Sequence, residues 1–272
     1  MPYTSFWRLA DFMDGSLRAG RLLFAIAMVL FGFEFFLFVT GISGPLPGPP
    51  WSRGVLFPDW LACAGFIFAG VSIAMGKMAR LVATFLGVVL LLFVVGRYMQ
   101  VWLSRLHDPG QWTVVFEILA MVGGAWVLAA GFPADEKISY PRGSFVFQLA
   151  IVGRFLIAIS LVVFAVQHFM YAQFVASLIP AWIPARLFLA YFTGVAFIAA
   201  AISIATGIVL RLAGVLLGTM FFLWVILLHV PRVASAPRNG DEVTSLLVAL
   251  AISGVGFALA GASGNRPEGH EA

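Results

Sequence analysis

The sequence predicts an all-α integral membrane protein, with eight transmembrane helices arranged as two parallel-oriented four-helix repeats. Of its 272 residues, 62% are hydrophobic and only 10% are charged, whereas a soluble domain carries about 25% charged residues. The mean hydropathy is +1.02. Apolar stretches long enough to cross a hydrocarbon core of about 30 Å recur along the chain. The second half of the chain also repeats the first.

The repeat is visible in glycine and arginine residues that recur at a nearly constant offset. Gly20-Arg21 and the apolar run after it reappear at Gly153-Arg154. Almost the same offset relates several further pairs: Arg80 and Arg211, Gly87 and Gly218, Thr113 and Thr244, Gly123 and Gly254. Matching leucines mean little in an apolar chain, but matching arginines and glycines at one offset indicate an internal duplication.

Each repeat is expected to hold four spans. An even number of spans gives both copies the same orientation, so we expect an axis along the membrane normal to relate them. Ahead of the first span, residues 1–19 place Phe6, Leu9 and Met13 on one helical face, which is typical of an interfacial helix. The first repeat then covers 20–135 and the second 146–263. The expected spans are 20–41, 59–76, 81–104, 112–132, 147–170, 187–206, 211–230 and 243–262.

The distribution of lysine and arginine predicts the orientation. Basic residues concentrate on the side of the membrane where cytoplasmic loops lie. On the side that holds both termini the basic residues are Arg8, Arg18, Arg21, Lys77, Arg80, Lys137, Arg142, Arg154, Arg211 and Arg266; on the other side they are Arg53, Arg97, Arg105, Arg186, Arg232 and Arg238. We therefore expect both termini in the cytoplasm and the protein in a bacterial-type cytoplasmic (inner) membrane.

Ionisable side chains inside apolar spans cost free energy and are candidates for function. In the first repeat these are Glu34, Arg97 and Glu117, with Tyr98 beside them. At a rise of 1.5 Å per residue, Glu34 lies roughly 20 Å from the start of its helix and Arg97 roughly 25 Å from the start of its own. All four side chains therefore fall in the outer half of the membrane. This placement predicts contact of Arg97 with Glu34 or Glu117.

The second repeat replaces these charges with neutral or titratable groups. Glu34 aligns with Gln167, Phe35 with His168, and Tyr98 with His229. The three polar residues Gln167, His168 and His229 are expected at similar depth, beneath a lid at Pro180–Pro184, a segment that cannot continue a helix. We expect a cavity there that opens toward the outer leaflet and binds the headgroup of an amphiphile.

Other interpretations of these residues remain open. The carboxylate–arginine group can serve only to fix helix packing. Two histidines can ligate haem or a metal, but we favour hydrogen bonding to each other or to a quinone or lipid headgroup. No nucleotide-binding loop, metalloprotease motif or nucleophile elbow is present in the sequence. No self-sufficient enzyme is indicated, and the basic residues, placed between spans, indicate no nucleic-acid partner.

The second repeat resembles the DoxX-like membrane protein family over about 100 residues. The resembling stretches are Val166-Gln167-His168-Phe169, Pro180–Pro184, Tyr191–Gly194, Thr206–Ala213 and Leu228–Arg232. The first repeat resembles a divergent copy, with Glu34 in place of Gln167 and no histidine. The resemblance implies a four-helix membrane unit. Some members of the family are named after a quinol oxidase subunit or occur with thiosulfate:quinone proteins.

Two functions follow as expectations. The first is an accessory or anchoring subunit of a quinone-linked or respiratory redox assembly, with the lipid membrane and redox-complex subunits as partners and quinone as the cofactor to look for. The second is a binder or carrier of a lipid or small hydrophobic molecule without a redox role. A bound lipid in a partner-free preparation would favour the second, and co-purifying redox subunits the first.

Overall fold

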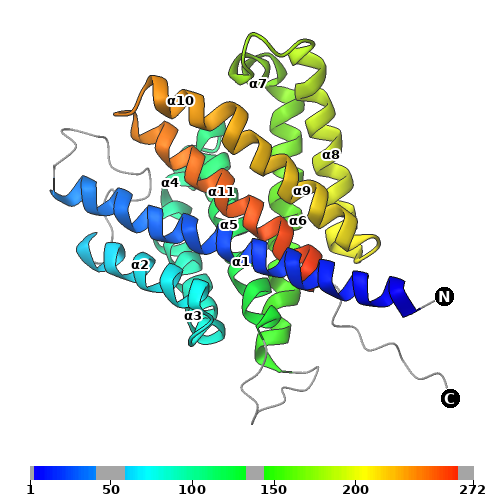
Figure 1. Cartoon of the computed structure of the whole chain (residues 1–272). Coiled ribbons are helices and arrows are strands. Elements are labelled where there is room, and N and C mark those ends of the chain that lie inside the picture. The colour runs from blue at the N-terminus through cyan, green and yellow to red at the C-terminus, as the bar shows by residue number, and fades with distance from the viewer. Residues whose placement is uncertain (1–2, 41–58, 133–143, 263–272) are drawn as a thin grey trace.

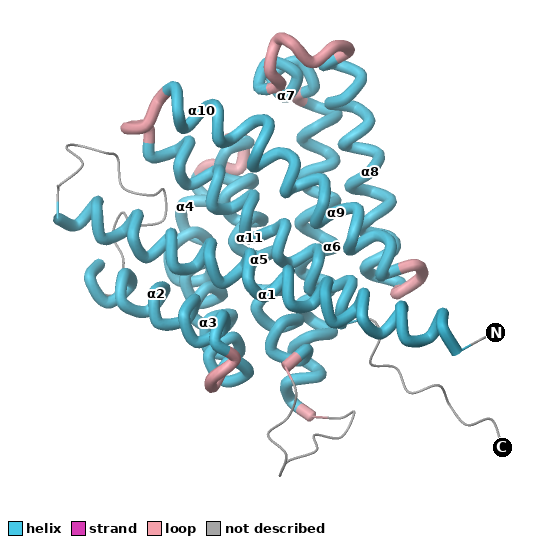
Figure 2. The backbone as a smooth tube through the Cα atoms, in the orientation of Figure 1, coloured by secondary structure: helices cyan, strands magenta, loops and turns pink. Residues whose placement is uncertain are grey.

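The computed structural model describes residues 3–40, 59–132 and 144–262. Every regular element in these ranges is a helix, and they contain no strand (Figures 1 and 2). The prediction of an all-α protein is therefore confirmed for the described residues. The physical reason is that a helix satisfies its backbone hydrogen bonds within one segment, as an apolar surrounding demands.

In the described residues the first half of the chain contains five α-helices and one π-helical turn. They are α1 (Tyr3–Thr40), α2 (Asp59–Met75), α3 (Ala79–Phe93), the π turn η1 (Val94–Tyr98), α4 (Met99–Ser104) and α5 (Pro109–Gly131). The expected N-terminal helix is the beginning of α1, which continues without a break past Arg21. Asp108 caps α5, because its Oδ1 accepts a 2.9 Å hydrogen bond from the Gly110 N–H, with Pro109 in the first turn.

In the described residues the second half contains six α-helices and one π-helical turn. They are α6 (Phe145–Met170), α7 (Ala172–Leu178), α8 (Arg186–Thr206), α9 (Leu210–Trp224), the π turn η2 (Val225–His229), α10 (Val230–Ser235) and α11 (Gly240–Ala262). The short helix α7 has no described counterpart in the first half. The two π turns begin at Val94 and Val225, which are separated by the same offset as Arg80 and Arg211. The left-handed residues Met78 and Val209 show this offset too.

Seven helices in the described residues are long and apolar enough to cross a membrane. These are Gly15–Thr40, Ala79–Gly96, Pro109–Gly131, Phe145–Met170, Arg186–Thr206, Leu210–Ser235 and Gly240–Ala262. The protein is thus a multi-pass membrane protein by the length and composition of its helices. The second expected span corresponds to α2, which has 17 residues and is shorter than these. Eight spans therefore remain a prediction.

The helices pack around two central ones, α5 and α11, which touch each other and are the most deeply buried (Figure 1). α1 packs against α2 and α11, while α6 packs against α8 and α5. α3 lies against α5, and α9 lies against α11. Each half thus sends its first helix across to the last helix of the other half, which brings segments far apart in the sequence side by side.

Glycine residues allow these crossings to be close. A Cβ atom added to Gly20 would lie 2.6 Å from the Gly254 carbonyl oxygen, and one added to Gly123 would collide with the Gly153 oxygen. Small residues at helix interfaces let the backbones approach, which is how membrane helices gain packing energy. The α1–α11 and α6–α5 contacts therefore both depend on pairs of glycines.

The ends of the helices define two ends of the bundle. We call distal the end where α1, α6 and α10 finish and where α2, α5, α8 and α11 begin, which runs from the left edge of the molecule to its top in Figure 1. At the opposite, proximal end, Arg154 Nη2 donates a 2.6 Å hydrogen bond to the Ile204 carbonyl, at the C-terminal end of α8. Arg80 donates likewise to the Phe132 carbonyl just after α5. These arginines satisfy carbonyl groups that a helix end leaves free.

Candidate functional site

Glu34 meets a partner that the sequence did not indicate, Thr244 on α11. The Thr244 hydroxyl donates a 2.5 Å hydrogen bond to Glu34 Oε1, across the contact between α1 and α11. The other carboxyl oxygen, Oε2, is buried and has no hydrogen-bond partner among the described residues. Because buried polar atoms are nearly always hydrogen-bonded, this oxygen is an exception that calls for a chemical explanation.

Gln167 makes the corresponding contact on the other side of the bundle. Thr113 Oγ1 on α5 lies 3.2 Å from Gln167 Oε1. The amide nitrogen Nε2 of Gln167 donates a 2.9 Å hydrogen bond to the Pro109 carbonyl at the start of α5. Both ends of this side chain are therefore engaged, whereas within the described part of the chain only one end of Glu34 is.

His168 lies in a cluster of aromatic rings rather than in an open site. Its Nδ1 lies 2.8 Å from the Phe164 carbonyl, so this nitrogen carries the hydrogen and donates it. The imidazole contacts Phe197 edge-on at 5.1 Å and stacks against Trp224 at 6.3 Å between ring centroids. Phe221 closes the cluster, 4.9 Å from Trp224. This surrounding leaves His168 a packed, hydrogen-bonded side chain.

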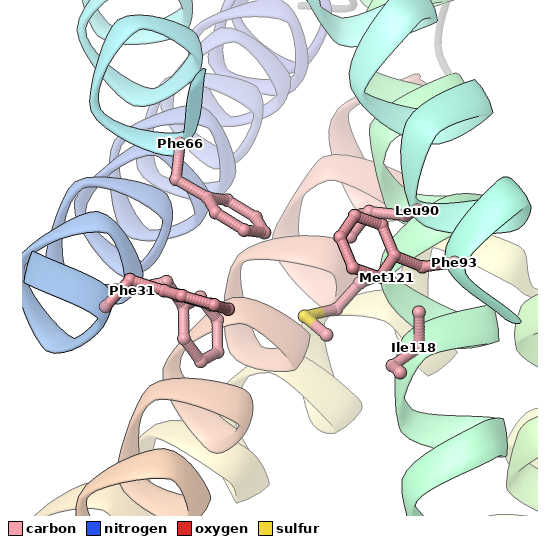
Figure 3. Close-up of a pocket in the computed structure, with 7 residues that line it drawn as sticks. Phe31, Phe66, Leu90, Phe93, Ile118 and Met121 are labelled. Atoms are coloured by element: carbon pink, nitrogen blue, oxygen red, sulfur yellow. The ribbon is translucent and has the colours of Figure 1, made fainter. Parts of the chain in front are cut away.

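The matching place in the first half holds a small apolar cavity (Figure 3). Phe31 and Phe66 approach it from α1 and α2, and Leu90 and Phe93 approach from α3 (Figure 3). Ile118 and Met121 of α5 and Phe35 of α1 complete its wall. Its volume is about 20 Å³, enough for one water-sized group, but an apolar cavity of this kind stays dry.

His229 lies beside an ion pair at the distal end. Arg232 and Glu242 form two hydrogen bonds of 2.6 and 2.7 Å between α10 and α11. His229 is within electrostatic range of both groups, and its Nδ1 is buried with no hydrogen-bond partner in the described ranges. Among the described residues no group of three or more histidine, cysteine or acidic side chains is placed to hold a metal.

The remaining predicted residues are only partly described. Glu117 lies in α5, one residue from the buried Phe116 and Ile118. Arg97 and Tyr98 lie in the π turn η1, but their side chains are outside the described residues. The predicted contact of Arg97 with Glu34 or Glu117 therefore remains a prediction.

A groove opens at the distal end between α7 and the start of α8. Its volume is about 430 Å³. The polar side chains in its wall are Gln173, Ser177 and Arg186, and the apolar ones are Ala176, Ala185, Leu187 and Phe188. None of Gln167, His168 and His229 lines this groove. The expected headgroup cavity and the observed groove therefore share the neighbourhood of Pro180–Pro184 but not their side chains.

Sequence reasoning missed Arg186 and Gln173 as candidate site residues, because arginine and glutamine beside a helix start resemble ordinary interfacial residues. It also missed the roles of Thr113 and Thr244. A signal for these two existed: they form one of the pairs that the internal repeat aligns, and they are polar members of largely apolar segments.

Comparison with known proteins gives one family match. A family model described as a domain of unknown function, DUF8561, matches residues 157–253, from within α6 to within α11. The matched segment contains Gln167, His168 and His229, and it excludes Glu34 and Glu117. Searches of curated proteins and of solved structures found no match. The comparisons therefore assign no activity.

Proposed function

We propose that this membrane protein binds an amphiphile with an anionic headgroup, and that the groove between α7 and α8 is the headgroup site. The observation that carries the proposal is the composition of this groove. Arg186 and Gln173 supply hydrogen-bond donors beside the apolar Leu187 and Phe188. A guanidinium group binds phosphate or carboxylate oxygens through paired hydrogen bonds.

The position of the groove also fits a lipid. Trp182, between α7 and α8, is 71% exposed, and Tyr171, just before α7, is 37% exposed. Tryptophan and tyrosine favour the depth of the headgroups in a bilayer. Ser177 donates its hydroxyl hydrogen to the Phe174 carbonyl at 2.6 Å, so it can only accept from a ligand. Recognition of an anion therefore falls to Arg186 and Gln173.

Native mass spectrometry of the protein, released from a mild detergent, tests this proposal. We expect bound anionic lipid on the wild type and about 10- to 100-fold weaker retention in Arg186→Gln, since a hydrogen bond to a charged group contributes about 1.5–3 kcal/mol. Arg238→Gln is the matched control, because Arg238 is an exposed arginine at the same end but outside the groove. Equal retention in both variants would contradict the proposal.

A second candidate is an accessory subunit of a quinone-linked redox assembly. It is supported by the resemblance of segments such as Val166–Phe169 and Leu228–Arg232 to the DoxX-like family. This candidate predicts quinone in the organic extract and redox subunits in a native purification. A wild-type preparation that retains phospholipid but neither quinone nor partner proteins would favour the first candidate.

We further propose eight spans, both termini in the cytoplasm, and two four-helix copies related by an axis along the membrane normal, in a bacterial-type cytoplasmic membrane. The paired contacts support the two copies, because Glu34–Thr244 and Gln167–Thr113 join positions that the internal repeat aligns. Reporter fusions at each terminus, one active only in the cytoplasm and one only outside, test the orientation. A C-terminus outside would overturn it.

A further inference from the structure

The carboxyl oxygen Oε2 of Glu34 has no role in the proposed amphiphile site between α7 and α8. Glu34 Oε1 accepts from the Thr244 hydroxyl, and Oε2 is buried with no partner in the described part of the chain. The ion pair seen at this end joins Arg232 to Glu242 and does not include Glu34. An ionised carboxylate in such a place would carry, within a membrane span, a charge that no described side chain compensates, which is costly.

The corresponding contact in the other half indicates what Oε2 lacks. Gln167 sits against Thr113 as Glu34 sits against Thr244, and its second polar atom donates a hydrogen to the Pro109 carbonyl. Pro109 begins α5 as Gly240, its counterpart in the repeat, begins α11. An ionised carboxylate has no hydrogen to donate, but a carboxylic acid has one. A proton on Oε2 would therefore give Glu34 the hydrogen-bonding capacity of Gln167.

Glu34 is also close enough to the distal end to exchange a proton with water. It lies less than two turns before the end of α1, about 9 Å along the axis. Among the described residues, Asp241 of α11 is the charged group that lies within electrostatic range of Glu34, and the distal end also carries His229, Arg232 and Glu242, which lie within range of one another.

We propose that Glu34 is a proton-binding site, in which the resting protein carries a proton on Oε2 and exchanges it with water at the distal end. In the exchange the Oε2–H bond breaks, the proton passes to water and a carboxylate remains. This site is separate from the groove at Arg186, so neither proposal depends on the other.

Infrared spectroscopy of the purified protein at neutral pH, in H₂O and in D₂O, tests the proposal. We expect a band of protonated carboxylic acid that shifts in D₂O, is absent in Glu34→Gln and persists in Glu117→Gln. The same spectrum in wild type and Glu34→Gln would overturn the proposal. So would loss of the band when sodium or potassium ions are added, because Glu34 would then bind a metal cation.

A second measurement, chemical labelling, uses the wild-type protein and so does not depend on the folding of a variant. A hydrophobic carbodiimide reacts with protonated carboxyl groups in apolar surroundings, and peptide mass spectrometry locates the adduct. We expect the adduct on Glu34 in the wild-type protein, with labelling that falls as the pH is raised. Labelling of Glu117 alone would contradict the proposal.

Glu34→Gln should also melt at or above the wild-type temperature, because glutamine supplies the missing hydrogen-bond donor. A clear fall in the melting temperature would contradict that geometry.

Discussion

The two halves of the chain place apolar and aromatic residues at matching positions but fill the space between them differently. Leu90 and Phe93 in the first half correspond to Phe221 and Trp224 in the second, at the offset of the internal repeat. The smaller pair lines a cavity of about 20 Å³, while the larger pair packs with His168 and Phe197. The space between these helices is therefore a cavity in the first half and is filled by aromatic rings in the second, depending on the size of the two side chains at these positions.

The polar contacts of the two halves differ in a similar way. Gln167 uses both ends of its amide, whereas Glu34 uses one oxygen within the described residues. The distal end of α11 also carries the Arg232–Glu242 ion pair, while the corresponding positions in the first half are Val101 and Gln111. At these two aligned contacts, an ion pair accompanies the carboxyl group beside α11, and neutral hydrogen bonds accompany the amide beside α5.

The largest difference in stability between the halves is expected when an aromatic ring is removed from the cluster around His168 or from the matching cavity. Trp224→Ala should lower the free energy of unfolding by about 3–5 kcal/mol, the usual cost of emptying an aromatic site. Phe93→Ala should cost less, because one side of Phe93 already faces a cavity. Unfolding in denaturing detergent measures both variants. Equal losses would show that the cavity does not weaken the packing of Phe93.

The α1–α11 and α6–α5 contacts should lose similar stability when one of their glycines is replaced by alanine. A Cβ atom at Gly123 or at Gly254 would lie within 3 Å of backbone atoms of the facing helix, so Gly123→Ala and Gly254→Ala should each cost about 1–3 kcal/mol. Gly65→Ala is the control, since no described atom lies within 4 Å of its added Cβ and alanine favours the helix. Thermal melting in detergent distinguishes them. A stable Gly254→Ala beside an unstable Gly123→Ala would show that the two crossings are not equivalent.

Filling the apolar cavity of the first half should change the free energy of unfolding by a smaller amount and in the opposite direction, that is, it should stabilise the protein. Leu90→Phe introduces the residue found at position 221 and should raise the free energy of unfolding by about 0.5–1 kcal/mol if the ring enters the cavity. The reciprocal Phe221→Leu should lower it by about 1–3 kcal/mol through a new void. Denaturation in detergent measures both. A loss of stability in both variants would mean that the cavity is too small for the ring.

The smallest effect is expected at the ion pair. Arg232 and Glu242 are partly exposed, with 35% and 17% of their side-chain surfaces accessible, and such pairs contribute about 0.2–1 kcal/mol. A double-mutant cycle with Arg232→Gln and Glu242→Gln measures the coupling, and high salt should reduce it. A coupling well above this range would instead mark the pair as a main support of the α10–α11 corner.

Much of the fold could be predicted from the sequence because each span is distinct in composition. The largely apolar segments bounded by Arg80 and Ser104, and by Ser144 and Tyr171, are long enough to span a membrane as helices, which satisfy their own backbone hydrogen bonds. The expected boundaries agree with the helices to within a few residues, with two exceptions. α1 begins at Tyr3, well before the expected start at residue 20, and the α9–α10 segment continues through Pro231 to Ser235. Proline is tolerated within this continuous helix because the π turn η2 directly precedes it and lets the backbone adjust.

The candidate site was less predictable. Glu34, Gln167 and the two histidines stand out because polar groups are rare in these spans, but spacing alone does not identify their partners. Thr113 and Thr244 were visible as a pair related by the repeat, yet nothing in the sequence placed them against Gln167 and Glu34. The groove at Arg186 depends on how α7 folds back beside α8.

The class of the protein, the positions of its apolar helices and the internal repeat follow from the sequence alone, because they depend on composition and on local spacing. Tertiary structure decided that α1 packs on α11 and α6 on α5, so that Glu34 meets a threonine from the far end of the chain. Helical periodicity states which residues share a face, but not which neighbour that face meets. That choice depends on close backbone approaches, such as Gly20 against Gly254, which form only when both helices are present.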